Sequence, residues 1–135
     1  MPYISLPNLK LYYEVTGYGL PLLMIHGLGS NSRDWEKQVN PFAQKYQVIT
    51  LDLRGHGCSD KPPGPYSVKM FAEDTAGLMR ELGLVPSHVV GISMGGMVAF
   101  ELAVHFPELL RSLTVVNSYP EMRVETFYEH LQVWR

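Results

Sequence analysis

Val90-Gly91-Ile92-Ser93-Met94-Gly95-Gly96 is the stretch that decides the fold of this 135-residue chain. It joins an apolar run, His88–Ile92, to a segment with helical character, Gly95–His105. A serine between a buried strand and a helix, with glycine two positions before and two after, is typical of a turn that exposes a nucleophilic hydroxyl. Such a sharp turn strains the serine backbone, and a Cβ atom on either glycine would collide with the neighbouring strand or helix.

The elements on either side of this turn predict an α/β fold. Continuous apolar runs predict strands that are buried on both faces, at Leu20–Ile25, Tyr46–Leu51, His88–Ile92 and Ser112–Val116. Nearly alternating runs predict an opening hairpin or meander, at Tyr3–Leu6 and Leu9–Val15. Helical patterns lie between the strands, at Asn31–Phe42, Ser67–Leu82 and Gly95–His105. This order implies a mostly parallel sheet with crossover helices, whose sites form at the carboxyl ends of the strands.

Composition excludes several classes of protein. Hydrophobic residues make up 46% of the chain, charged residues 18%, and the net charge is −2, so we expect a globular domain that binds neither nucleic acid nor an anionic membrane. No apolar stretch approaches the ~20 residues of a membrane span, and no signal peptide is visible, so we expect a cytoplasmic protein. The five histidines lack the spacing of metal ligands, and we expect no metal or other cofactor.

Polar residues follow two of the buried strands. His26-Gly27-Leu28-Gly29 follows the first, and a turn that begins at Asp52 and Arg54 follows the second. We interpret His26 as a brace for its own loop, and Asp52 and Arg54 as residues that hold their turn by hydrogen bonds and an ion pair. Cys58, the single cysteine, is interpreted as a small buried residue rather than a reactive thiol.

Four motifs, in this order along the chain, resemble the α/β-hydrolase fold family, specifically its esterase, lactonase and cofactor-free perhydrolase branch. They are Tyr12-Tyr13-Glu14-Val15 with Gly17, His26-Gly27-Leu28-Gly29 with Ser32 and Trp35, the run Asp52–Ser59, and the turn at Ser93. The resemblance implies that Ser93 attacks the acyl carbon of a small ester or lactone. It also implies that the backbone N–H groups of Leu28 and Met94 form the oxyanion hole.

The general base and its orienting acid are harder to place. In the family both follow the serine. The 42 residues after Ser93 hold two histidines, His105 and His130, and Glu121 is the acid that we considered there, but we assign none of the three. We therefore interpret the chain as the N-terminal half of a hydrolase, with a core at 1–118 and the start of a lid at 119–135. The strand edge at 112–116 would then be unprotected, so we expect it to self-associate or to pair with a C-terminal half.

Two alternatives remain at this stage. One is a binding module on the same scaffold, for which the absent base argues. The other is a Rossmann-type dinucleotide-binding domain, because Gly27-x-Gly29-x-x-Ser32 follows a buried strand and Asp52 ends the next one. That alternative leaves the turn at Ser93 unexplained.

Overall fold

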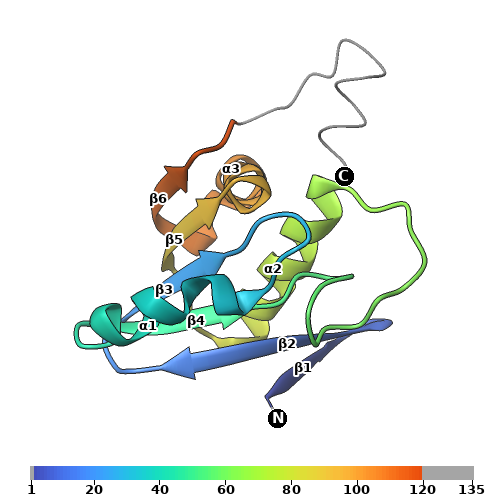
Figure 1. Ribbon diagram of the computed structural model, residues 1–135. Helices are drawn as coiled ribbons and strands as arrows, with labels where there is room; N and C mark the ends of the chain where they lie inside the picture. Colours follow the sequence, from blue (N-terminus) through green and yellow to red (C-terminus); the bar gives the residue numbers. More distant parts are fainter. Residues whose placement is uncertain (1, 120–135) are drawn as a thin grey trace.

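The computed structural model describes residues 2–119, which form a six-stranded sheet flanked by helices (Figure 1). The strands are β1 (Tyr3–Leu6), β2 (Leu9–Thr16), β3 (Leu20–Ile25), β4 (Tyr46–Leu51), β5 (Ser87–Ile92) and β6 (Leu110–Val116). Their order across the sheet is β1-β2-β4-β3-β5-β6. The first two strands are antiparallel to their neighbours, and β4, β3, β5 and β6 run parallel. The predicted α/β class is therefore confirmed.

The helices begin and end at the residues that the sequence marks for capping. Helix α2 (Val68–Leu82) starts where the Ser67 side chain accepts a hydrogen bond from the Met70 amide, and it ends at Gly83, whose φ of 67° is left-handed. Helix α3 (Met94–His105) starts directly after Ser93. The expected helix at Asn31–Phe42 is instead two pieces, the 3-10 turn η1 (Ser32–Trp35) and α1 (Glu36–Phe42). A second 3-10 turn, η2 (Pro107–Leu109), precedes β6.

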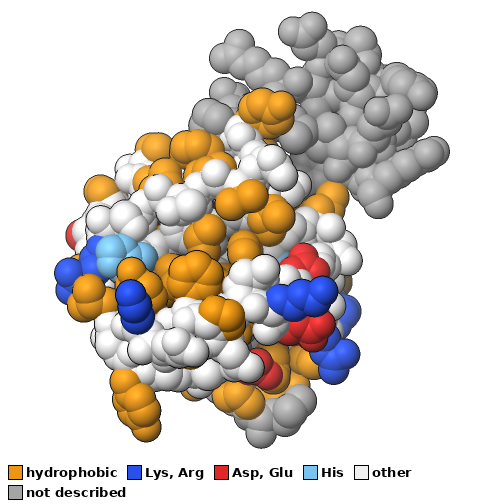
Figure 2. Space-filling view, turned by 60° about the vertical axis from the view of Figure 1, so that its left-hand side comes forward, with side chains coloured by type: hydrophobic (Ala, Val, Ile, Leu, Met, Phe, Trp, Pro, Cys, Tyr) orange, Lys and Arg blue, Asp and Glu red, His pale blue; other side chains and the backbone are white. Residues whose placement is uncertain are grey.

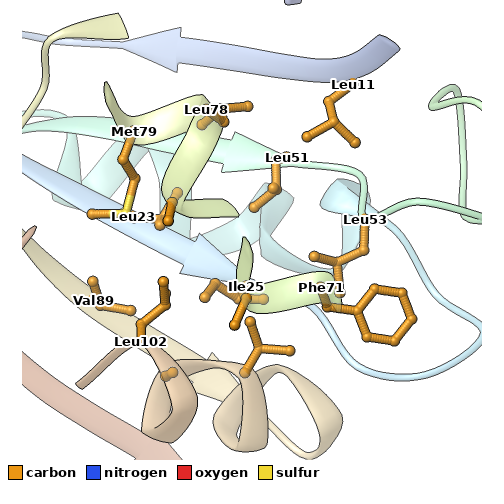
Figure 3. Close-up of a cluster of buried hydrophobic side chains, with 14 of the residues drawn as sticks. Leu11, Leu23, Ile25, Leu51, Leu53, Phe71, Leu78, Met79, Val89 and Leu102 are labelled. Carbon is orange, nitrogen blue, oxygen red and sulfur yellow. The ribbon is translucent and has the colours of Figure 1, made fainter. Parts of the chain in front are cut away.

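The main hydrophobic core lies between the sheet and helices α2 and α3. Figure 3 shows its side chains converging from the strands and from both helices. Leu11, Leu23, Ile25, Leu51 and Phe71 are no more than 1% exposed there. Since successive side chains of a strand point to opposite faces, the other face of β3 carries Leu22 and Met24, which join a smaller cluster with Trp35 and Val48. The strands that carry the candidate site are thus packed from both sides.

The strand at Ser112–Val116 was expected to be buried on both faces, and this expectation is wrong. In the structure the segment is part of the longer strand β6, none of whose residues is fully buried. Among the described residues it lies at the edge of the sheet, beside β5 alone, where the open edge at 112–116 was expected. An apolar run did not by itself imply burial on both faces. Of the expected lid, 119–135, only Tyr119 lies within the described residues, so Glu121 and His130 fall outside them.

No helix within residues 2–119 is long and apolar enough to cross a membrane.

Candidate active site

Ser93 occupies a strained turn between β5 and α3. Its backbone φ of 53° and ψ of −120° lie outside the regions that non-glycine residues ordinarily adopt. The turn is held by several hydrogen bonds: the Ser93 amide donates to the Val116 carbonyl at 3.0 Å, and the Ser93 carbonyl accepts from the Gly96 amide at 2.9 Å and from the Ser118 hydroxyl at 2.5 Å. The side chain is exposed at the end of the sheet. Ser118, which sequence reasoning did not single out, thus supports the turn.

Two glycines make this turn possible. A Cβ atom on Gly91 would lie 2.1 Å from the Gly95 carbonyl oxygen, and one on Gly95 would lie 2.2 Å from the Ile25 carbonyl oxygen. Both distances are far shorter than any non-bonded contact. The glycine spacing that singled out Ser93 in the sequence therefore reflects close backbone packing between β3, β5 and α3.

The loop after β3 lies against the Ser93 turn. A Cβ atom on Gly27 would be 3.4 Å from the Ser93 Cβ and 3.9 Å from its Oγ. Leu28, the next residue, is 40% exposed, whereas Met94 is buried at the first turn of α3. Among the hydrogen bonds between residues 2–119, neither the Leu28 amide nor the Met94 amide is a donor. Two backbone N–H groups that have no acceptor among the described residues therefore belong to the two segments that meet at Ser93.

Every histidine within residues 2–119 has a partner other than Ser93. His26 donates through Nδ1 to the Gly27 carbonyl and accepts the Leu53 amide at Nε2, which is the bracing role expected for it. Burial lowers the pKa of His26 below its usual 6.5, which favours the neutral ring. His56 accepts the Gly29 amide, His88 contacts the Ser112 hydroxyl, and His105 pairs with Glu101 on the surface of α3. The described residues thus bring no imidazole to the Ser93 hydroxyl.

The turn after β4 is held by charged side chains, as expected, although not by a pair within the turn. Asp52 accepts the Ser32 amide at 2.7 Å and the Cys58 amide at 2.8 Å. Arg54 instead forms a two-point ion pair with Asp74 of α2, at 2.6 and 2.8 Å, which raises the pKa of the guanidinium. Asp74 could not be recognised from the sequence as the partner of Arg54, because the pairing spans 20 positions and joins a turn to a helix.

Two other predictions for this region change. Cys58 is exposed, contrary to the expectation of a buried residue, because its backbone faces Asp52 while its side chain lies at the surface. Asp52 is 2% exposed and each of its oxygens accepts a backbone amide, so its carboxylate holds the turn and is not displayed for the ribose contact of a dinucleotide-binding domain. Within residues 2–119 no three histidine, cysteine or acidic side chains are grouped as metal ligands would be.

Comparison with known proteins agrees with this geometry. A family described as alpha/beta hydrolase fold matches residues 21–135. RutD of Azorhizobium caulinodans, whose name gives carbamate hydrolysis as its expected activity, is 39% identical over 88% of this chain and 45% of its own. The 3-oxoadipate enol-lactonase 2 of Acinetobacter baylyi is 39% identical over 72% of this chain and 36% of its own.

The likeness extends to solved structures. Est816, described as an N-acyl homoserine lactone degrading enzyme, superposes with a TM-score of 0.83 at 35% identity, over 87% of this chain and 45% of its own. The chain therefore spans less than half the length of the relatives and of the solved structure that it matches here. The matched residues include β3 to β6 and the Ser93 turn, and the chain belongs to the α/β-hydrolase fold family.

Proposed function

We propose that this chain carries the nucleophile and the oxyanion hole of a serine hydrolase that cleaves a small carboxylic ester or lactone. The observation that carries the proposal is the Ser93 turn. It holds an exposed serine on a strained backbone, beside the first turn of α3 and the loop that follows β3. Relatives named as a lactonase and a lactone-degrading enzyme support a cyclic ester as one substrate of this class.

The chemistry proceeds through an acyl-enzyme. The Ser93 Oγ attacks the acyl carbon, its proton passes to a general base, and the carbonyl oxygen becomes an oxyanion. The Leu28 and Met94 amides donate to that oxyanion, aided by the N-terminal end of α3. The alcohol then leaves with the proton, and water attacks the acyl group to release the acid and restore the serine. In a lactone the leaving alcohol and the acid stay on one molecule.

The general base and its orienting acid complete the proposal. Since the described histidines are engaged elsewhere, we place both groups outside residues 2–119, in the stretch after Tyr119 or in the part of the relatives' length that this chain does not span. A serine without its base retains only a residual ~10³–10⁴-fold acceleration over the reaction in water. The native polypeptide, with its boundaries established by intact mass, is therefore the material for the test.

Labelling with a fluorophosphonate tests this function. We expect one adduct on the peptide that contains Ser93, none in Ser93→Ala, and ester or lactone turnover that is lost with the label. Ser5→Ala, an exposed serine on β1, is the matched control and keeps both. An unlabelled native polypeptide, or a label that survives Ser93→Ala, contradicts the proposal and favours a binding module on the same scaffold.

The free edge of β6 carries a second proposal, on association. Strand β6 pairs only with β5, so its outer backbone groups face no other strand among the described residues. An open edge favours the addition of a further strand. We propose that residues 112–116 take up such a strand, and that the isolated chain self-associates when no other is supplied. Sedimentation of a single monomeric species at micromolar concentration contradicts this.

A further inference from the structure

Two loops meet at the end of the sheet beside the Ser93 turn. One follows β3 and contains His26 to Gly29; the other follows β4 and contains Leu53 to His56. Because β3 and β4 are parallel neighbours, both loops leave the same edge of the sheet. Each contributes one buried histidine, His26 at 0% and His56 at 8% exposure, and the two ring centres are 5.0 Å apart.

The two imidazoles bridge the loops in both directions. His26 of the first loop accepts the Leu53 amide of the second at Nε2, at 3.0 Å, and His56 of the second accepts the Gly29 amide of the first at Nε2, also at 3.0 Å. Each Nδ1 faces a carbonyl oxygen, that of Gly27 at 2.7 Å and that of Arg54 at 2.9 Å. Carbonyl oxygens only accept, so both rings are neutral and carry their proton on Nδ1.

These bonds fix the two peptide planes on either side of Leu28. The Gly27 carbonyl and the Leu28 N–H belong to one planar trans peptide and point in opposite directions. Holding the Gly27 oxygen, by His26 Nδ1–H and by the Ser30 amide at 3.3 Å, therefore sets the direction of the Leu28 N–H. His56 holds the following plane through the Gly29 N–H. Gly29 has a φ of 72°, in the left-handed region that glycine adopts without steric cost.

We propose that His26 and His56 are positioning residues, a reciprocal pair of neutral imidazoles that aims the Leu28 amide at the oxyanion formed on Ser93. The pair is anchored in turn, because Arg54, whose carbonyl receives His56, is held by Asp74 of α2. The catalytic part of this inference rests on the proposed function, whereas the tautomers and the bonds between the loops do not.

The first experiment measures the tautomers by imidazole nitrogen NMR on the chain at neutral pH. We expect both rings to carry the proton on Nδ1, and we expect a coupling across the hydrogen bond from the Gly29 amide to His56 Nε2. A proton on Nε2 of either ring overturns the inference, because that nitrogen could then accept no amide. This measurement needs no catalytic activity and no variant.

The second experiment measures the rate of fluorophosphonate labelling of Ser93 in the native polypeptide. His56→Phe keeps a ring against Phe71 but removes the acceptor, and we expect labelling to slow by about 10- to 100-fold, less than the ~10²–10³-fold cost of losing an oxyanion donor, because the Leu28 amide is misdirected rather than removed. His56→Gln restores an acceptor and stays within about threefold of the parent. His105→Gln, on the exposed face of α3, is the control and leaves the rate unchanged.

The outcomes separate the two proposals. If both rings carry their proton on Nδ1 but Ser93 takes no label, the proposed function is overturned and the bridging pair of histidines is not. A labelled Ser93 whose rate is equal in the parent, His56→Phe and His56→Gln overturns the positioning role. The positioning role is also overturned if His56→Phe and His56→Gln both lose labelling rate in proportion to their loss of stability. That result would mark a histidine that only supports the fold. If His56→Phe does not fold, the tautomer measurement still decides whether the two histidines bridge the loops.

Discussion

The two faces of the sheet are covered very differently. Helices α2 and α3 close one face over an extensive cluster of buried side chains, whereas among residues 2–119 the other face carries only η1, α1 and a four-residue cluster (Figure 1). The cavities on that second face include one of about 640 Å³ between β2 and α1 and one of about 330 Å³ over β3, β5 and β6. Figure 2 shows a view of the molecule in which hydrophobic side chains gather across the middle and charged ones lie at the sides.

The rigidity of the Ser93 site comes from the closed face of the sheet. The Ser93 turn, the start of α3 and the Arg54–Asp74 pair all belong to the closed face or to its edge. A strained backbone persists only where its surroundings over-determine it. The open face contributes little to that restraint. Substitutions on the closed face should therefore cost more unfolding free energy than substitutions on the open face.

The largest effect is expected in the core of the closed face. Leu23 and Leu22 are neighbours on β3 that point to opposite faces, at 0% and 8% exposure. Leu23→Ala should cost about 3 kcal/mol of unfolding free energy, because it leaves a cavity in dense packing. Leu22 lies beside the 330 Å³ cavity, so its site is already open. Leu22→Ala should therefore cost less unfolding free energy than Leu23→Ala, by about 1 kcal/mol or more. Denaturant unfolding of both variants measures this, and equal losses would refute the contrast.

The next effect concerns the ion pair between α2 and the turn after β4. Asp74 is 9% exposed and Arg54 is 19% exposed, so Asp74→Asn should destabilise the fold by about 2 kcal/mol. The matched variant is Glu108→Gln, whose partner is Arg80 in an exposed pair at 3.4 Å. That loss should stay below about 0.5 kcal/mol, as for most surface pairs. A cost for Glu108→Gln as large as that for Asp74→Asn would show that burial does not decide these energies.

A smaller effect should appear as a dependence of stability on pH. The pKa of His26 is lowered below 6.5 by burial, so between the two values the unfolded chain binds more protons than the folded one. The stabilisation is complete above about pH 6.5 and is lost on acidification, by at most about 1.4 kcal/mol per pH unit. Unfolding free energies from pH 8 to pH 5 measure the slope. His26→Asn should flatten it and His105→Gln should not; an unchanged slope in His26→Asn assigns it to other groups.

The smallest effect is expected on the open face. Trp35 Nε1 is a buried donor with no partner among the described residues. Trp35→Phe removes that unsatisfied donor along with some apolar area, so the two terms oppose each other, and the net change should be within about 1 kcal/mol. A thermal or denaturant midpoint measures it. A loss of 3 kcal/mol or more would mean that this face is packed as tightly as the other.

Much of the fold was predictable because local rules govern it. Two-sided apolar runs placed β3, β4 and β5, and Ser67 and Gly83 marked the ends of α2. The Ser93 turn was recognisable because its two glycines stand at a fixed local spacing, although the contact that requires Gly95 comes from the neighbouring strand β3. An open edge at residues 112–116 was expected from the family resemblance, and β6 lies at the edge of the described sheet. The exposure of β6 was not predictable, because an apolar run does not show what covers a strand.

The chain by itself therefore determined its elements, its family resemblance and the residue most suited to nucleophilic attack. The contacts between distant segments became visible only in three dimensions: Ser118 donates to the Ser93 carbonyl, Asp74 pairs with Arg54, and His26 and His56 each accept an amide from the other's loop. The physical reason is the range of the interactions. Backbone conformation and hydrophobic periodicity are local properties that a sequence displays directly, whereas hydrogen bonds between loops depend on how parallel strands bring their ends together.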